Sequence, residues 1–290
     1  MGLTLDQSYY QRTSFKKDLF KGKVAFVTGG AGSICRVQVE ALVLLGANVA
    51  IIGRDQQKTE SVAQEIQSLR SNSKVIGIGN TDVRDIHSLI KAVNYTVKQL
   101  GRIDFVIAGA AGNFISDFNS LSSNAFKSVI SIDLLGSFNT IKSTFNELIK
   151  SKGSIIFVSA TLHYYGIPFQ SHVSAAKAGI DALSNALAVE LGPLGIRSNC
   201  IAPGIIKDTE GFNRLKGDGD EDSFAQKIPL QRLGTKEDIA NATVFLFSEA
   251  GNYITGDIIV IDGGAWHTFQ PAMESYPKLL KKKLLGEPKL

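Results

Sequence analysis

Cysteine is scarce in this chain, and neither sign of charge is in large excess. Cys35 and Cys200 are the two cysteines and lie far apart in hydrophobic surroundings, which indicates a reducing compartment rather than a disulfide framework. Lys and Arg number 31 against 27 Asp and Glu, a net charge of +4. This charge is too small and too scattered to indicate nucleic-acid binding, although anionic small molecules remain possible.

Long apolar runs are also missing. No run approaches the roughly 18 residues of a membrane-spanning helix, and the N-terminus lacks the positive-then-apolar pattern of a signal peptide. We therefore expect a soluble protein that is neither secreted nor bound to a membrane.

What is present is a regular alternation of strand-like and helix-like segments along 290 residues. This alternation predicts a doubly wound, Rossmann-type α/β fold, with a seven-stranded parallel sheet, helices on both faces and ligands at the carboxyl ends of the strands. Strands are predicted at 23–28, 47–53, 74–78, 103–108, 154–159, 196–201 and 258–261, and helices at 37–45, 59–69, 87–100, 121–149, 175–191 and 236–247.

One domain accounts for most of this length. We predict a catalytic domain over 21–265, preceded by an N-terminal arm at 1–20 and followed by a tail at 266–290. The acidic, glycine-rich stretch at about 207–228 breaks the alternation and predicts a mobile lid.

A glycine-rich turn follows the first predicted strand and opens a helix, as in sites that bind a pyrophosphate. The alternative is a tight strand-to-helix turn without a ligand. Arg54 follows the second strand, where a guanidinium suits the 2′-phosphate of NADPH better than NADH; alternatively it is a solvated surface arginine. Asp82 and Val83 follow the third strand and are candidates for the adenine edge. The turn comprises Gly29, Gly30, Ala31, Gly32, Ser33 and Ile34.

Together with Lys177 these motifs resemble the short-chain dehydrogenase/reductase family over roughly residues 20 to 265. Further matches are Ala108-Gly109-Ala110-Ala111-Gly112, Asn199-Cys200-Ile201-Ala202-Pro203-Gly204 and Asp262-Gly263-Gly264. The chain departs from the family at four places: Ser33 and Cys35 replace two loop glycines, Asp133 replaces the catalytic asparagine, and Val173 replaces the tyrosine four residues before Lys177.

The missing tyrosine changes the expected chemistry. In ordinary members it gives a proton to the carbonyl oxygen while hydride attacks the carbonyl carbon, and valine cannot do so. Hydride can instead add to a carbon–carbon double bond conjugated with a carbonyl, which needs a stabilised oxygen and a positioned water or acid. With these departures the chain closely resembles one branch of the family, the fungal type of peroxisomal 2,4-dienoyl-CoA reductases. Segments that carry this resemblance include Ala111-Gly112-Asn113-Phe114 and Pro229-Leu230-Gln231-Arg232-Leu233-Gly234.

This resemblance implies an NADPH-dependent reduction of a 2,4-dienoyl-CoA to a 3-enoyl-CoA. Lys177 would hold the nicotinamide ribose and add positive charge, and Asp133 would orient the water that supplies the proton. Asp262 would be a second acidic partner. The alternatives are a helix-surface carboxylate for Asp133 and a turn cap before Gly263 for Asp262.

The resemblance also implies further ligand contacts, and no metal site. Ala110, Pro203, Gly204, Ile206 and Thr209 would contact the cofactor. The substrate residues would be Arg84 and Arg214 for the CoA phosphates, Asn113 and Phe114 beside the acyl chain, Tyr164 at the thioester and Ser159 at the nicotinamide pocket. Arg214 could instead be solvated, Tyr164 could pack its loop, and the Ser159 hydroxyl could bond the backbone.

The chain ends in Pro288-Lys289-Leu290, which resembles the Ser-Lys-Leu address read by the peroxisomal import receptor. The expected location is the peroxisomal matrix, and the alternative is a frayed basic tail. Long helices at 121–149 and 175–191 predict a homodimer or homotetramer. Two other functions stay open: a related reductase acting on a 2-enoyl-CoA or a carbonyl, and a noncatalytic NADPH-binding protein.

Overall fold

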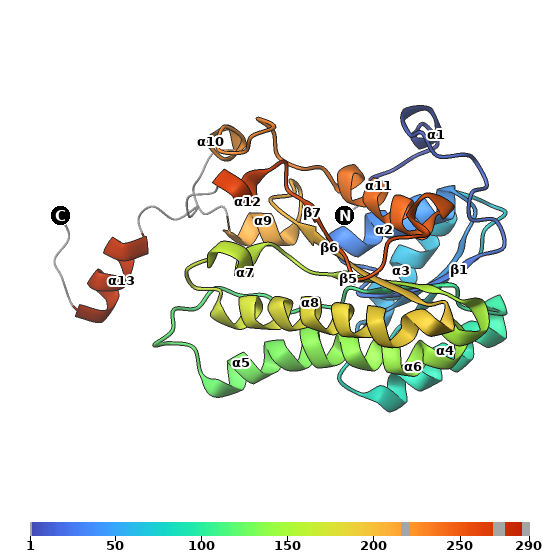
Figure 1. The fold of residues 1–290 in the computed structure, drawn as a ribbon, viewed down its shortest axis with the longest axis horizontal. Coiled ribbons are helices and arrows are strands. Elements are labelled where there is room, and N and C mark those ends of the chain that lie inside the picture. The colour runs from blue at the N-terminus through green and yellow to red at the C-terminus, as the bar shows by residue number, and fades with distance from the viewer. Residues whose placement is uncertain (1, 216–220, 269–275, 286–290) are drawn as a thin grey trace.

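The computed structural model describes residues 2–215, 221–268 and 276–285. Seven parallel strands form one sheet in the order β3-β2-β1-β4-β5-β6-β7 (Figure 1). The Rossmann-type, seven-stranded parallel sheet is confirmed. The strands are β1 (Val24–Thr28), β2 (Asn48–Ile52), β3 (Val75–Ile78), β4 (Phe105–Ala108), β5 (Ser154–Val158), β6 (Arg197–Pro203) and β7 (Ile258–Ile261).

Helices cover both faces of the sheet. Figure 1 shows α2 (Ser33–Leu44), α3 (Gln56–Gln67) and α11 (Lys236–Phe247) on one face. On the other face lie α4 (Ile86–Leu100), α6 (Gly136–Ser151) and α8 (Ser171–Leu191). The shorter helices are α1 (Tyr9–Arg12), α5 (Ser123–Val129), α7 (Leu162–Tyr165), α9 (Glu210–Leu215), α10 (Glu221–Ala225), α12 (Ala265–Thr268) and α13 (Tyr276–Leu285), with 3-10 turns at Gly192–Leu194 and Glu249–Gly251.

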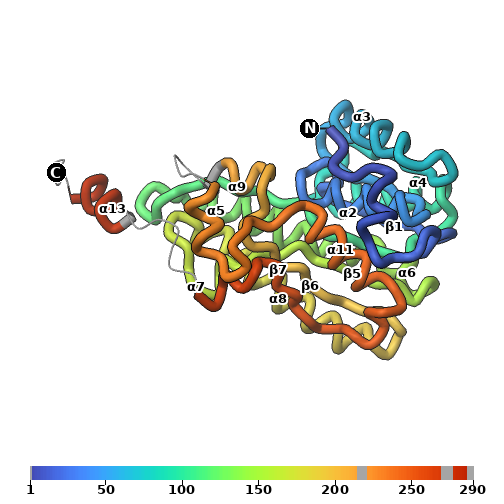
Figure 2. The backbone as a smooth tube through the Cα atoms, turned by 90° about the horizontal axis from the view of Figure 1, so that it is seen from above, coloured from blue at the N-terminus to red at the C-terminus, as the bar shows by residue number. Residues whose placement is uncertain are grey.

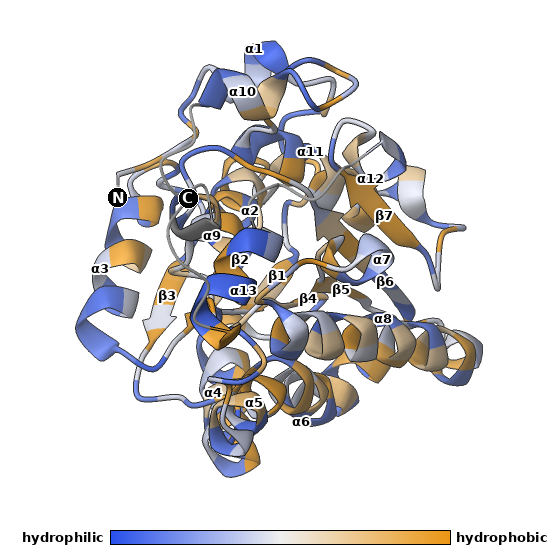
Figure 3. Ribbon diagram, turned by 90° about the vertical axis from the view of Figure 1, so that its left-hand side faces the viewer, coloured by the Kyte–Doolittle hydropathy of each residue, from blue (hydrophilic) through white to orange (hydrophobic). Residues whose placement is uncertain are grey.

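The sheet separates two apolar cores. Ala25, Val27 and Ile51 belong to the core beneath α2 and α11, whereas Phe26, Ala50 and Ile52 belong to the core beneath α4, α6 and α8. Neighbouring strand residues thus alternate between two buried faces, and the strands are hydrophobic on both sides (Figure 3). This double burial is typical of parallel sheets with helices on each face.

The helix expected over 121–149 is three elements instead of one. α5 ends at Val129, a π-helical stretch covers Ile130–Leu135, and α6 begins at Gly136. A π-helical turn contains more residues than an α-helical turn, and such turns are frequent at functional sites. Asp133, one of the predicted catalytic residues, lies within it.

The predicted N-terminal arm packs against the domain. Leu5 and Tyr9 are buried in the core beneath α2, as is Phe20. The Glu40 carboxylate on α2 accepts hydrogen bonds from the backbone amides of Thr4 and Leu5 at 3.0 and 2.9 Å. These contacts fix the start of the chain against α2.

The elements near the carboxyl ends of the strands enclose the space where ligands bind in folds of this kind. The smooth trace in Figure 2 brings α7 and α9 to this end of the molecule, with α13 beyond them. The predicted lid contains α9 and α10, and residues 216–220 between them lie outside the described residues.

Candidate active site

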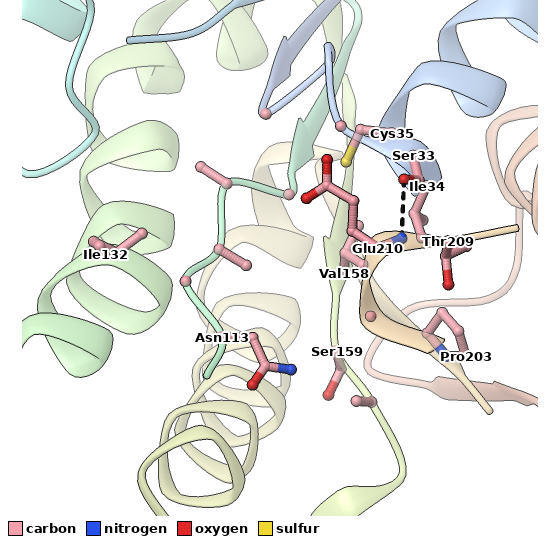
Figure 4. A pocket seen from close by; sticks show the side chains of 18 of the residues that line it. Ser33, Ile34, Cys35, Asn113, Ile132, Val158, Ser159, Pro203, Thr209 and Glu210 are labelled. Carbon is pink, nitrogen blue, oxygen red and sulfur yellow. Dashed lines mark hydrogen bonds between the residues drawn. The ribbon is translucent and has the colours of Figure 1, made fainter. Parts of the chain in front are cut away.

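One large cavity of about 1140 Å³ opens at the carboxyl edge of the sheet. It is lined by the loops that follow β1 to β6, with Phe224 from α10 and Ala265 from α12. Most of the predicted site residues therefore meet in one space (Figure 4). Those lining it are Gly29, Ala31, Gly32, Ser33, Ile34, Arg54, Asp82, Val83, Ala110, Asn113, Phe114, Ser159, Pro203, Gly204, Ile206, Thr209 and Asp262.

The glycine-rich turn forms the floor of one part of this cavity. Gly29 has φ +70°, and a Cβ there would lie 2.8 Å from the carbonyl oxygen of Gly109, so the turn requires glycine at this position. Gly32 then precedes the first turn of α2, whose amides favour a bound anion. Gly30 differs from the prediction because it faces Ile51 of the core and does not line the cavity.

The loop after β2 supplies two cations. Arg54 is exposed and lines the cavity, as does Lys58, four residues later in the first turn of α3. Our sequence reasoning did not include Lys58, which lies in the first turn of α3 directly after the loop that carries Arg54. The glycine turn after β1 fits the diphosphate of NADPH. The two cations after β2 fit its 2′-phosphate.

Arg84 does not lie where we predicted. Its guanidinium forms an ion pair with the Asp82 carboxylate at 2.5 Å, and it does not line the cavity. The turn after β3 explains this pairing, because the Asp82 carboxylate also accepts the Arg84 backbone amide at 2.9 Å. The Arg84 guanidinium lowers the pKa of Asp82, so this carboxylate stays ionised beside the cavity.

A buried ion pair lies behind the cavity wall. The Lys177 ammonium is 3.3 Å from Asp133 Oδ2 and donates to the Val158 carbonyl at 2.9 Å. The other carboxylate oxygen of Asp133 accepts the Gly112 amide at 2.7 Å. Asp133 is fully buried and Lys177 is 7% exposed, so Asp133 is not the helix-surface carboxylate that we considered as the alternative.

Val173 lies in an apolar cluster between two helices. It is 2% exposed and packs with Val129 and Ala176 in a small apolar cluster, against which Leu162 also packs. The side chain at the tyrosine position is therefore part of the packing between α5 and α8.

Cys35, which replaces a loop glycine, is buried under the cavity floor. Gly109 leaves room for its sulfur, because a Cβ on Gly109 would clash with Cys35 Sγ. Burial raises the pKa of the thiol to about 12, so it remains protonated and unreactive at neutral pH.

Asn113 and Ser159 lie on opposite sides of the same part of the cavity (Figure 4). Ser159 is 3% exposed, and its hydroxyl has no protein hydrogen-bond partner among the described residues. A buried hydroxyl without a partner is costly unless a ligand or water bonds it, so Ser159 is suited to contact a bound molecule.

The loop that carries Asn113 is fastened to α8. The Phe114 carbonyl accepts hydrogen bonds from Gln170 Nε2 and His172 Nε2, both at 3.1 Å. The His172 ring also stacks on Phe114 with 4.2 Å between ring centroids. Burial lowers the pKa of His172, which keeps the imidazole neutral at neutral pH. Our sequence reasoning missed His172, which lies directly before Val173.

Tyr165, rather than the predicted Tyr164, lines the cavity. The Tyr164 hydroxyl lies 3.4 Å from Asp181, and its ring packs edge-on against Trp266. Asp181 also pairs with His163 at 2.8 Å. The helix α7 turns consecutive tyrosines in different directions, which gives Tyr164 the packing role that we kept as an alternative.

Asp262 lines the cavity, and its carboxylate is engaged locally. Its two oxygens accept the amides of Gly264 and Trp266, each at 2.8 Å. This is the arrangement expected of a turn cap. It leaves Asp133 and Asp262 without a direct contact between them.

The first turn of the lid lies against the glycine-rich loop. The Glu210 amide is 3.4 Å from the Ser33 hydroxyl, as the dashed line in Figure 4 marks. Thr209 Oγ1 donates to the Ile206 carbonyl at 2.8 Å. Arg214 belongs to α9, but its side chain lies outside the described residues.

The described residues contain neither a membrane-spanning helix nor a metal cluster. No helix there combines the length and apolar character that crossing a membrane needs, and no three His, Cys, Asp or Glu side chains there gather in a way that could hold a metal ion.

The chain is similar in sequence to known reductases. The profile of the family described as Enoyl-(Acyl carrier protein) reductase matches residues 29–266. The chain is 61% identical over 287 residues to the peroxisomal 2,4-dienoyl-CoA reductase of Saccharomyces cerevisiae, designated (3E)-enoyl-CoA-producing, with 98% of each chain covered. The Danio rerio protein of the same designation is 43% identical, with 88% of this chain and 85% of that protein covered.

Solved structures of short-chain dehydrogenases superpose on this fold. The citronellol catabolism dehydrogenase AtuB of Pseudomonas aeruginosa PAO1 superposes with a TM-score of 0.76 at 31% identity, covering 88% of this chain and 99% of the other. A short-chain type dehydrogenase/reductase from Mycobacterium ulcerans gives 0.83 at 27% identity, covering 92% and 97%. The chain therefore belongs to the short-chain dehydrogenase/reductase family of oxidoreductases, in the fungal branch of its peroxisomal 2,4-dienoyl-CoA reductases.

Proposed function

We propose that this protein reduces 2,4-dienoyl-CoA thioesters to 3-enoyl-CoA with NADPH, in the β-oxidation of unsaturated fatty acids. One observation carries the proposal: a buried Asp133–Lys177 ion pair lies directly behind the cavity wall formed by Gly112 and Val158, while the position of the family's tyrosine is an apolar, packed valine. The relatives in Saccharomyces cerevisiae and Danio rerio are named for this reaction and this product.

The cofactor site uses residues of the first three strand ends. NADPH supplies the hydride when it is bound. The Gly29–Ile34 turn would hold its diphosphate, Arg54 and Lys58 its 2′-phosphate, and Val83 and Ala110 its adenine side. Lys177 would bind the nicotinamide ribose, and its charge would stabilise negative charge that develops on the substrate.

The proton reaches the substrate through an oriented water in this proposal. Asp133 is held by the Gly112 amide and by Lys177, so its carboxylate has a fixed direction. A fixed carboxylate can orient a water that gives a proton to the α-carbon, and the hydroxide that remains would take a proton from solvent. Asn113 and Ser159 would donate hydrogen bonds to the thioester oxygen, where negative charge accumulates.

Asp262 and Tyr165 shape the same end of the cavity. We assign Asp262 an indirect part, because both its oxygens accept backbone amides. Burial and, to a lesser degree, the Asp262 charge raise the pKa of Tyr165, which keeps the phenol protonated beside the substrate.

We assign the protein to the peroxisomal matrix, as the names of the relatives indicate. The Pro288-Lys289-Leu290 end, which lies outside the described residues, would contact the import receptor. We also propose a homodimer or homotetramer. Leu135 at the end of the π-helical stretch, Phe138 and Ile149 on α6, and Val189 on α8 are exposed apolar side chains that association of two copies would cover.

The test compares three thioesters in one assay. We expect loss of NADPH absorbance with a 2,4-dienoyl-CoA and none with a 3-ketoacyl-CoA. A faster reaction with a 2-enoyl-CoA would assign the enzyme to that substrate instead. Cofactor binding without reduction of any thioester would indicate a noncatalytic protein.

A further inference from the structure

The C-terminal helix α13 is docked at the edge of the molecule where the active-site cavity opens. Figures 1 and 2 show it beyond the carboxyl edge of the sheet and beside the loop that precedes α5. Seen from that edge, α13 lies in front of the strands (Figure 3). The helix is therefore positioned at the entrance side of the site and not against the sheet.

Specific contacts hold α13 on this loop. The Lys283 ammonium forms an ion pair with the Asp117 carboxylate and donates to Ser120 Oγ at 3.0 Å. Asp117 is 5% exposed, and the Lys283 contact lowers its pKa to about 2, so the carboxylate is ionised throughout the neutral range. Leu279 and Leu280 enclose a small cavity with Ile115 and Phe169.

This docking leaves three lysines on the other side of the helix. Leu279, Leu280 and Lys283 share one face at helical spacing, and they are the α13 residues that line the small cavity. Lys278, Lys281 and Lys282 are exposed and project from the opposite face, with no ion pair among the described residues.

Ile115 connects α13 to the active site, because it lines both the small cavity and the large one. It directly follows Asn113 and Phe114, which line the substrate end of the large cavity. The opposite end is lined by Arg54 and Lys58, which we assign to NADPH. A CoA thioester with its acyl end beside Asn113 would extend past Ile115 toward α13.

A CoA thioester has the chemistry that such an exit requires. Its acyl end must reach the Asp133–Lys177 region, and its adenosine 3′-phosphate and diphosphate then extend outside, carrying several negative charges. Clustered lysines attract such groups as point charges, and their effect falls with ionic strength.

We propose that Lys278, Lys281 and Lys282 of α13 form a binding subsite for the phosphorylated nucleotide of the CoA substrate, held in position by the Lys283–Asp117 ion pair. This inference rests on the proposed function, since it names where that substrate's nucleotide binds.

The test uses two dienoyl thioesters that differ only in the nucleotide: a 2,4-dienoyl-CoA and the corresponding dienoyl-pantetheine. The triple variant Lys278→Gln, Lys281→Gln, Lys282→Gln should raise KM for the CoA ester about tenfold, with kcat and the pantetheine ester unchanged. Salt should raise KM of the wild type for the CoA ester more steeply than that of the variant. Lys98→Gln, an exposed lysine in the last turn of α4 at the opposite edge of the sheet, is the matched control.

A second variant tests the docking contact. Asp117→Asn should release α13 and raise KM for the CoA ester in the same direction, and adding it to the triple variant should give little further change. An effect of the triple variant on both thioesters alike, or on neither, would overturn the inference.

Binding of adenosine 3′,5′-bisphosphate, measured by calorimetry, separates this inference from the proposed reaction. If wild-type enzyme oxidises NADPH with neither dienoyl thioester, the proposed reaction fails. The subsite then stands if the bisphosphate binds the wild type several-fold more tightly than the triple variant, and it is overturned if the affinities are equal.

Discussion

The Lys177 ammonium lies 3.3 Å from a carboxylate oxygen of Asp133, and protein surrounds both groups. A buried ion pair of this kind is costly to break on one side, because the remaining charge then has no partner. The pair joins α8 to the π-helical stretch; Asp133 Oδ1 accepts the Gly112 amide and Lys177 donates to the Val158 carbonyl. A substitution that keeps shape and removes one charge therefore needs a stability measurement beside the kinetic one.

Asp133→Asn should lower kcat about 100-fold or more, because the amide keeps the shape but cannot act as the carboxylate that orients the water. NADPH binding, followed by fluorescence titration, should change little. Asp85→Asn is the control, since Asp85 is an exposed cap at the start of α4 where asparagine caps equally well. Full turnover by Asp133→Asn would remove this residue from the mechanism.

Val173→Tyr should not create a carbonyl reductase. The valine is packed against Val129 and Ala176, so the larger ring should destabilise the fold by about 1–3 kcal/mol through overpacking. Urea denaturation measures that loss, and an assay with a 3-ketoacyl-CoA measures the chemistry. Val173→Ile, which adds one methylene, should cost less. Rapid ketone reduction by the tyrosine variant would show that valine alone decides the reaction.

Arg54→Ala should raise KM for NADPH by about 10- to 100-fold, the effect of losing charge-assisted hydrogen bonds worth about 1.5–3 kcal/mol. KM for NADH should stay within about twofold, because NADH has no 2′-phosphate. Lys58→Gln should act in the same direction and more weakly. Steady-state kinetics with both cofactors provide the measurement, with Lys91→Gln on α4 as control. An equal rise for NADH would contradict the assignment.

Acid should destabilise the protein partly through His172. Burial lowers its pKa in the folded state, so above about pH 6.5 the imidazole is neutral in both states and contributes no pH dependence. As pH falls below that value, the unfolded chain takes up a proton that the folded chain resists, and stability is lost until the folded pKa is reached.

His172→Gln should remove this dependence, because its amide can still donate to the Phe114 carbonyl but does not titrate. Urea midpoints of both proteins at pH 7.5 and 5.5 measure the difference, and groups common to both cancel. We expect the wild type to lose more stability between these values. Parallel losses would contradict a lowered pKa at His172.

The fold and the cofactor loops could be predicted because their signals are local. The strand β7 matches the predicted 258–261 range, and Gly29 is required by a turn next to a strand. The burial of Asp133 could not be predicted, because helical periodicity assumes a constant number of residues per turn and the π-helical stretch breaks it. The usable signal for Lys58 was its place just after the N-cap Asp55, in the first helical turn that follows the Arg54 loop.

The predictions that differ from the structure concern side chains on loops. Nothing periodic distinguishes Tyr164 from Tyr165, and only the packing against Asp181 and Trp266 separates them. Arg84 was expected to face a ligand, but a turn of three residues folds it back on Asp82.

The π-helical stretch allows Asp133 to face Lys177 while the buried face of α6, in the same continuous helical segment, faces the core. Successive residues of an α-helix are rotated by about 100°, so deleting one residue between 130 and 135 would turn Asp133 and the buried face of α6 against each other by about that angle. Either the carboxylate would leave Lys177, or Ile141 and Leu148 would leave the core. A single-residue deletion between Asp133 and α6 should therefore be damaging whichever residue is removed, which makes this stretch a constraint on length as much as on composition.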